Sequence, residues 1–104
     1  MIGIYKITSP SGKIYIGQSV NINNRISSYI NLKCRNQIKL YNSLLKYSFD
    51  KHKFEILEEC DVDVLNERER YYQDYYNASS EKNLNCKLTN TNDKTGFLST
   101  ETKA

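Results

Sequence analysis

The sequence predicts an α+β (α/β) domain with a small, three-stranded, mostly antiparallel sheet flanked by helices, in the element order ββααβα. Three observations support this fold class. The 104 residues fit one small domain. Runs rich in β-branched and aromatic residues alternate along the chain with segments of helical periodicity. No apolar run approaches the ~20 residues that a membrane helix needs, so we expect no membrane partner.

The chain opens with a predicted β-hairpin. Residues 2–8 and 13–17 are rich in β-branched and aromatic residues, which is typical of strands. Ser9–Gly12 is typical of a turn, because proline presets φ at its second position and glycine suits the fourth. This turn permits pairings whose two residue numbers add to an even sum. Such a register would place Tyr5 and Tyr15 on one face of the sheet, where ordinary packing would also explain them.

Hydrophobic spacing predicts the later elements. Apolar residues at helical intervals indicate two helices after the hairpin, then an alternating stretch indicates a third strand, and a third helix follows. Polar capping residues support the starts of the first and last helices. The predicted elements are a helix from its cap Asn21 to about Lys33, a helix over about residues 37–47, a strand over residues 54–57, and a helix capped by Asp61 or Asp63 that runs to about Tyr76.

The end of the chain has a different character. Residues 77–83 are typical of a loop, and residues 84–88 are typical of a short extended segment. From Asn90 onward the sequence is polar and shows no periodicity. We therefore expect one folded domain over residues 1–89 and a polar tail or linker over residues 90–104.

Basic residues concentrate in the first half of the chain. Residues 1–53 carry nine Lys or Arg residues and one acid, Asp50, for a formal charge of +8, whereas the remaining residues carry −5. A basic half is typical of proteins that bind a polyanion, most often nucleic acid. A solvated basic face balanced by an acidic face would explain the same counts.

The histidine and cysteine counts exclude two classes of metal site. A single histidine, His52, rules out a multi-histidine zinc centre built within the chain. The three cysteines, Cys34, Cys60 and Cys86, form no C-x-x-C pair, which argues against a disulfide scaffold or a zinc knuckle. We expect buried thiols and a reducing, intracellular setting.

One glutamate interrupts the apolar stripe of the third predicted helix. Glu69 lies between Leu65 and the pair Tyr72 and Tyr76, at helical spacing. A carboxylate in such a stripe points toward the core or a cleft, where it must be protonated, paired or bound to a cation. A salt bridge to an arginine and a lone carboxylate ligand for Mg²⁺ both satisfy this requirement.

Arg25 lies at the flank of the apolar stripe of the first predicted helix, three residues after Ile22 and four before Tyr29. A planar guanidinium at this place could bind a phosphate or Glu69 through two parallel hydrogen bonds. Alternatively, its aliphatic stem covers the core while its charge stays in water.

Five features together resemble the GIY-YIG endonuclease superfamily, with the homing-endonuclease-like branch most similar. The resemblance covers roughly residues 1–88. Each tripeptide alone would be a weak signal, because short motifs recur by chance. The features are Gly3-Ile4-Tyr5, then Tyr15-Ile16-Gly17 after nine intervening residues, Arg25 eight residues after the second glycine, Glu67-Arg68-Glu69, and Leu84-Asn85-Cys86.

The resemblance implies a divalent-metal-dependent DNA endonuclease that hydrolyses phosphodiester bonds. Glu69 would hold one Mg²⁺ (or Mn²⁺) ion at the scissile phosphate, and Arg25 would stabilise the charge of the transition state. Tyr5 would act as general base or would orient the attacking water, although a tyrosine with a pKa near ~10 is a poor base at neutral pH. Tyr15 would hydrogen-bond the phosphate or the water network, and Asn85 would brace the site.

The chain departs from several family members at its histidines. Tyr29 occupies the position where those members have histidine, and we expect it to take the supporting role of that position. The one histidine, His52, matches no catalytic position, and we expect it on the surface or in a loop. A histidine general base is therefore not expected. Gly3 and Gly17 would let strand and DNA backbone approach closely, because they lack a Cβ.

DNA is the expected partner. Lys33, Arg35 and Lys39 are the predicted DNA contacts of the basic half. Residues 97–104 faintly resemble the start of a modular DNA-binding repeat, and this resemblance implies that the tail begins a further DNA-binding module. We expect a monomeric domain that acts inside the cell, where its DNA is. The alternative is a nucleic-acid-binding module on the same fold with weak or no cleavage.

Overall fold

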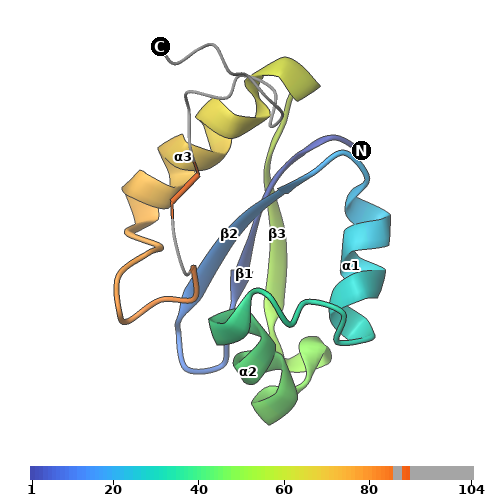
Figure 1. Ribbon diagram of the computed structural model, residues 1–104, viewed down its shortest axis with the longest axis vertical. Helices are drawn as coiled ribbons and strands as arrows, with labels where there is room; N and C mark the ends of the chain where they lie inside the picture. The colour runs from blue at the N-terminus through green and yellow to red at the C-terminus, as the bar shows by residue number, and fades with distance from the viewer. Residues whose placement is uncertain (86–87, 90–104) are drawn as a thin grey trace.

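Three strands form one antiparallel sheet in the order β2–β1–β3, with α3 on one face and α1 and α2 on the other (Figure 1). The structure is a computed structural model that describes residues 1–85, 88 and 89. Along the chain the elements are β1 (Gly3–Thr8), β2 (Ile14–Ser19), α1 (Ile22–Ile30), α2 (Ile38–Tyr47), the 3₁₀ turn η1 (Phe49–Lys51), β3 (Lys53–Glu59), the 3₁₀ turn η2 (Val62–Val64) and α3 (Leu65–Tyr76). The predicted fold class and element order are confirmed.

The opening hairpin has the predicted register. Tyr5 pairs with Gly17 and Ile7 pairs with Tyr15, so the facing residue numbers add to an even sum. The backbone N–H of Gly12 donates to the carbonyl of Ser9 at 2.9 Å. Gly12 has φ +87°, a left-handed conformation that glycine adopts without steric cost. Tyr5 and Tyr15 consequently share one face of the sheet, as the turn predicts.

Alternation along the strands divides the core into two clusters. Tyr5, Ile7 and Tyr15 belong to the cluster that also contains buried residues of α1 and α2. Ile4 and Ile16, which point to the opposite face, pack with Leu65 of α3, together with Ala78 and several partly buried side chains. β2 is an edge strand, so side chains from both faces can meet around its outer edge.

The outer edge of β2 is covered by two asparagine side chains instead of a fourth strand. Asn83 Oδ1 accepts from the backbone N–H of Ile14 at 2.8 Å. Asn85 accepts from the N–H of Ile16 at 2.7 Å and donates to its carbonyl at 2.9 Å. Between them, the N–H of Leu84 donates to the carbonyl of Ile14 at 2.9 Å. Leu84 and Asn85, the first residues of the extended segment expected over residues 84–88, lie against this edge without forming a strand, and residues 86 and 87 lie outside the described part.

Several predicted boundaries differ from the structure. α1 ends at Ile30, not near Lys33, and Leu32 has φ +57°. β3 extends beyond the predicted residues 54–57 at both ends. The predicted aspartate cap of the third helix is wrong, because α3 begins at Leu65 and its capping position is held by Val64 without a side-chain hydrogen bond. Asp61 instead precedes η2, and its side chain makes no capping hydrogen bond there.

Two further expectations concern membranes and thiols. Within the described residues, no helix has the length and apolar character needed to span a bilayer. Cys34 is buried and Cys60 is half-buried, and both thiols are free. Cys86 and the tail from Asn90 lie outside the described residues, so the expectations for them stay predictions.

Asn85→Ala is expected to lower the free energy of unfolding by about 1–3 kcal/mol, because it leaves the buried N–H and carbonyl of Ile16 without their partners. The matched control is Asn31→Ala, which removes an exposed side-chain bond to the carbonyl of Ser27 that water can replace. The control should stay within about 0.5 kcal/mol of wild type in urea unfolding. Equal losses in both variants would contradict the edge-sealing role of Asn85.

Candidate active site

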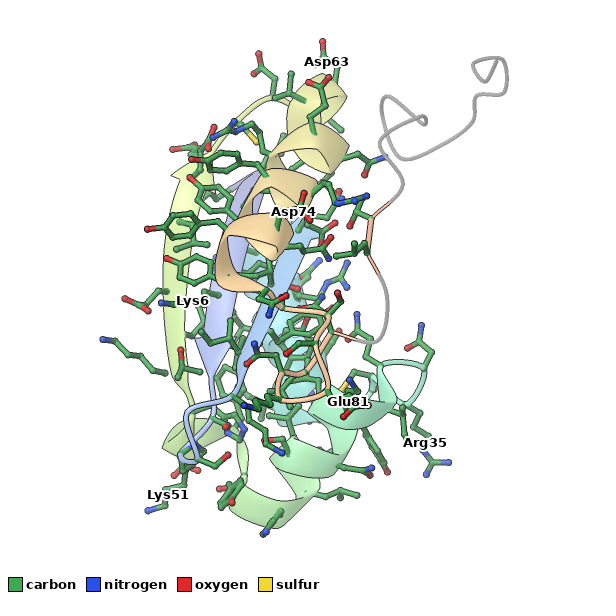
Figure 2. The ribbon with its side chains drawn as sticks, turned by 90° about the vertical axis from the view of Figure 1, so that its left-hand side faces the viewer. Lys6, Arg35, Lys51, Asp63, Asp74 and Glu81 are labelled. Carbon is green, nitrogen blue, oxygen red and sulfur yellow. The ribbon has the colours of Figure 1, made fainter. Side chains whose placement is uncertain are left out.

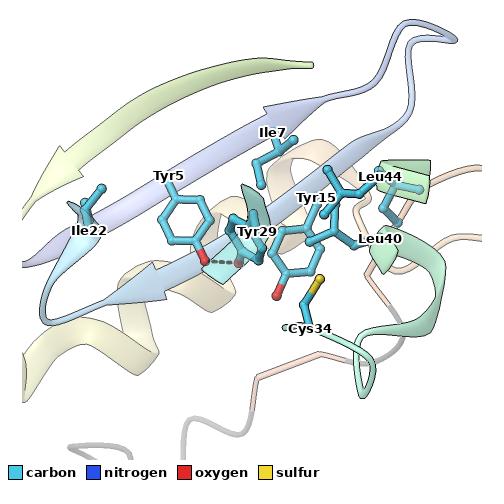
Figure 3. Close-up of a cluster of buried hydrophobic side chains, with 9 residues drawn as sticks. Tyr5, Ile7, Tyr15, Ile22, Tyr29, Cys34, Leu40 and Leu44 are labelled. Atoms are coloured by element: carbon cyan, nitrogen blue, oxygen red, sulfur yellow. Dashed lines mark hydrogen bonds between the residues drawn. The ribbon is translucent and has the colours of Figure 1, made fainter. Parts of the chain in front are cut away.

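Three tyrosines from different elements meet beside the edge strand. The ring of Tyr5 on β1 lies 6.4 Å from that of Tyr15 on β2 and 6.1 Å from that of Tyr29 on α1, centroid to centroid. The hydroxyls of Tyr5 and Tyr29 are hydrogen-bonded to each other (Figure 3). Tyr15 accepts a hydrogen bond from the side-chain amide of Gln37 at 2.6 Å. The structure therefore brings together three of the predicted site residues.

Both motif glycines are required by packing within the protein. A Cβ at Gly17 would overlap the ring and hydroxyl of Tyr5, which crosses the edge strand at this point. A Cβ at Gly3 would overlap the carbonyl oxygen of Glu58 on β3. The expectation that these glycines leave room for DNA is corrected on this point, because protein atoms fill the space at both positions.

Burial makes Tyr5 and Tyr15 weaker acids than an exposed tyrosine. It raises the pKa of Tyr5 and of Tyr15 well above the ordinary value, and the neighbouring tyrosines add to the effect. The positive charge of Arg25 lowers both pKa values but does not compensate for burial. At neutral pH these side chains are thus neutral phenols, which can donate and accept hydrogen bonds but do not readily take up a proton.

Arg25 lies one helical turn before Tyr29 on α1 and is partly exposed. Burial disfavours its charge, but the oxygens of Tyr5, Tyr29 and Tyr15 outweigh burial and raise its pKa. Within the described part of the chain, no carboxylate forms an ion pair with its guanidinium. The side chain also lines a cavity of about 290 Å³ whose other lining residues are Ser19, Val20, Asn21, Asn24 and Ser28. This cavity offers one positive charge and several hydroxyl and amide groups to a ligand.

Glu69 approaches the edge strand from the other face of the sheet. Its side chain on α3 is buried, and Oε1 accepts hydrogen bonds from Gln18 Nε2 at 2.7 Å and from Thr89 Oγ1 at 2.5 Å. Burial raises the pKa of Glu69, and the two hydrogen bonds and the charge of Arg25 offset this only in part. The alternative of a salt bridge to an arginine is not what the structure shows. Instead, amide and hydroxyl donors hold one oxygen of the carboxylate.

The buried face of α3 is more polar than the sequence pattern indicates. Asn66, Glu69 and Gln73 are buried along it, whereas Tyr72 and Tyr76 are only partly buried. Gln18 Nε2 also donates to Asn66 Oδ1 at 2.7 Å, and Gln73 Oε1 accepts from the backbone N–H of Thr89 at 2.8 Å. The predicted stripe of Leu65, Tyr72 and Tyr76 does pack in one hydrophobic cluster. A line of buried polar side chains, which the pattern did not indicate, runs beside it around the carboxylate.

The donor set fits a hard divalent cation. No described residue donates a hydrogen bond to the second oxygen of Glu69, and no cationic side chain pairs with this carboxylate there. Among the described residues, no cluster of three or more His, Cys, Asp or Glu could hold a metal. Mg²⁺ binds to one or two carboxylates and keeps several waters, whereas zinc needs three or four protein ligands. A single carboxylate with one free oxygen is enough to bind Mg²⁺ but not enough to bind zinc.

The other predicted residues take different positions. Both ends of the Asn85 amide bind the backbone of Ile16, so this side chain braces β2. Lys33 and Arg35 are exposed between α1 and α2, and Arg35 points into solvent (Figure 2). Lys39 Nζ lies 3.4 Å from the carbonyl of Ser80.

His52 lies in the short loop between η1 and β3, one of the two expected places, but it is buried and not on the surface. One ring nitrogen lies 2.8 Å from Ser43 Oγ and the other lies 2.8 Å from the carbonyl oxygen of Ser48. These contacts tie the end of α2 to the start of β3. His52 is thus a structural residue away from the tyrosines and Glu69.

Sequence reasoning did not identify the residues that hydrogen-bond to the predicted site residues. The alternation of β2 could have found Gln18, because it shares the face of Ile16 and thus faces α3. Nothing in the spacing indicates Thr89, which follows Glu69 by twenty residues and reaches it only through the fold. Gln37, the partner of Tyr15, also comes from a separate element.

Comparison with known proteins agrees with this geometry. A family model described as the GIY-YIG catalytic domain matches residues 1–85. The fold resembles a mutant form of the catalytic domain of intron endonuclease I-TevI, with TM-score 0.75 and 25% identity over 86% of this chain and 96% of that one. It also resembles the catalytic domain of homing endonuclease I-TevI, with TM-score 0.71 and 26% identity over 84% and 99% of the two chains. No curated protein sequence matches the chain.

Without metal, Glu69→Gln is expected to raise the free energy of unfolding at neutral pH. Because burial raises the pKa of Glu69, the folded protein retains a proton that the unfolded chain releases. The wild type therefore loses stability as the pH rises through the folded pKa. The glutamine carries no charge, and its oxygen can still accept the hydrogen bonds of Gln18 and Thr89.

Urea unfolding in EDTA at about pH 4 and about pH 7.5 would measure this difference. The advantage of Glu69→Gln over wild type should be larger at the higher pH. Glu67→Gln, an exposed neighbour on the same helix, should show no such change. A pH-independent difference for Glu69→Gln would contradict a buried carboxylate with a raised pKa.

Proposed function

This chain belongs to the GIY-YIG catalytic domain family and is an endonuclease, and on that premise we propose that it hydrolyses DNA with one divalent ion, Mg²⁺ or Mn²⁺, held by Glu69. The observation that carries the proposal is the Glu69 carboxylate, which is buried, has one oxygen held by Gln18 and Thr89, and has no cationic partner among the described residues. A cation would offset the cost of burying this charge.

Gln18 and Thr89 fix the direction of the carboxylate in this proposal. Both hydrogen bonds end on Oε1, so Oε2 is left to bind the ion. An ion bound there would supply positive charge to polarise the scissile phosphate and to stabilise the transition state. The protein's part is to aim the carboxylate toward the edge of β2, where a bound cation would favour its ionised form.

Arg25 is the residue proposed to stabilise the transition state. Its guanidinium is always charged and can fork onto two phosphate oxygens. The charge of Arg25 lowers the pKa of Glu69, so the two side chains interact electrostatically across the edge strand. The polar cavity beside Arg25 is the place proposed for the phosphate.

The tyrosines are proposed to orient the attacking water and the phosphate by hydrogen bonds and not to remove protons. Tyr5 has no exposed surface, its hydroxyl is bonded to Tyr29, and burial raises its pKa well above the ordinary value. These facts favour the water-orienting role of Tyr5 over the general-base role. Tyr15 and Tyr29 complete the phenol cluster that supports Arg25. We place this activity inside the cell, together with the DNA.

Glu69→Ala is expected to abolish nicking of supercoiled plasmid DNA, because it removes the carboxylate proposed to hold the ion. The wild type should nick with Mg²⁺ and not with EDTA, and Glu67→Ala should match the wild type. DNA binding by Glu69→Ala, measured in EDTA, should persist or tighten, because an unneutralised carboxylate repels phosphate.

Absence of wild-type nicking across divalent metals and pH values would sink the proposed cleavage and would support the binding-module alternative. Binding of Mn²⁺ by wild type but not by Glu69→Ala, followed by electron paramagnetic resonance, tests the ligand assignment without reference to activity.

Arg25→Ala is expected to lower the cleavage rate by about 10²–10³-fold, the usual cost of one donor to a transition-state oxyanion. Arg25→Lys should lose less, because it keeps the charge and loses only the fork. Single-turnover cleavage measures both rates, and circular dichroism checks folding. Cooperative unfolding of Arg25→Ala at room temperature would instead indicate a structural role.

A further inference from the structure

A second cavity lies at the opposite end of β2 from Glu69, between the hairpin turn and α2. Its volume is about 180 Å³. The β1–β2 turn lies next to α2 in Figure 1, and the chain after α3 returns to the same place. The lining residues are Ser11, Lys13, Lys39, Asn42, Ser43, Lys46, Tyr47 and Leu84.

The charge of this cavity is of one sign. Lys13, Lys39 and Lys46 line it, and no carboxylate does. None of these lysines forms an ion pair with a described residue, whereas Lys6 and Lys53 both pair with Glu55. Three positive charges around one cavity repel each other, so an anion bound in the cavity would lower the electrostatic energy.

The side chains in the cavity suit an anion with several oxygens. Lys39 Nζ lies 3.4 Å from the carbonyl of Ser80, and Lys46 Nζ lies 5.2 Å from the ring centroid of Tyr47, so neighbouring groups limit where the two ammonium groups lie. Ser11 and Asn42 add a hydroxyl and an amide that can hydrogen-bond to oxygen. Phosphate accepts bonds from ammonium, hydroxyl and amide donors together.

We propose that this cavity, the lysine pocket, binds a backbone phosphate of the DNA at a distance from the bond that is cut. The inference rests on the proposed function, because it takes DNA as the ligand. Lys13 lies just before β2 and Gly17 lies on it, four residues further along the chain, which corresponds to about 13 Å of extended chain. A DNA strand carries one phosphate per ~3.4 Å of helix axis, so a few nucleotides span this distance. The lysine pocket would thus fix the register of DNA across the active site.

The test compares two charge-matched variants. Lys13→Gln/Lys46→Gln removes two pocket lysines, and Lys6→Gln/Lys53→Gln removes two paired lysines elsewhere. Fluorescence anisotropy with a short DNA duplex in EDTA measures binding without cleavage. The pocket variant should bind about tenfold more weakly, with the slope of log K against log salt reduced by about 1. The control should stay within about twofold of wild type.

Equal effects in both variants would overturn the inference, because binding would then follow net charge alone. Amine-reactive labelling of the wild type covers the case in which the pocket variant does not fold. DNA should slow the labelling of Lys13, Lys39 and Lys46 and leave Lys6 and Lys53 unchanged, and the absence of this pattern would also overturn the inference. A wild type that binds through the pocket but never nicks would refute the proposed cleavage and leave the pocket assignment standing.

Discussion

The ring of Tyr5 crosses the edge strand at Gly17, and the rest of the site depends on this contact. Only glycine leaves the space that the ring occupies. The ring then reaches α1, where its hydroxyl bonds to that of Tyr29, and this bond fixes the face of α1 that turns toward the sheet. Arg25, one helical turn away from Tyr29, is placed by the same packing. A close fit between two strands thus determines where the positive charge of the site lies.

The site is built around an edge strand, so groups from both faces of the sheet can meet at it. The three tyrosines and Arg25 lie on one face of the sheet. Glu69 lies on the other face, where Gln18 of the edge strand donates a hydrogen bond to it. The remainder of the edge is closed by the amide of Asn85, which binds the backbone of Ile16 as a strand would. This cover satisfies the backbone groups there and leaves the other end of β2 to the site.

Burial has opposite consequences for the two kinds of acid in the site. It keeps Tyr5 and Tyr15 protonated, so they serve as neutral hydrogen-bonding groups. It also makes the charge of Glu69 costly, and only two hydrogen bonds and the charge of Arg25 oppose that cost. Neutral phenols beside a buried carboxylate that lacks an ion-pair partner among the described residues are consistent with the proposed cation and not with a tyrosine acting as the base.

The sequence by itself determined the order of elements, an even register of the hairpin, and the three tyrosines that meet beside the edge strand. Local pattern sufficed because strand alternation, turn residues and helical spacing act between near neighbours. Only the tertiary structure decided the partners: Thr89 on Glu69, Asn85 on the edge of β2, and the burial of His52. Only the tertiary structure also shows why position 17 is glycine, because the ring of Tyr5 fills the place of its Cβ. Such contacts join residues far apart in the chain, so no local periodicity encodes them.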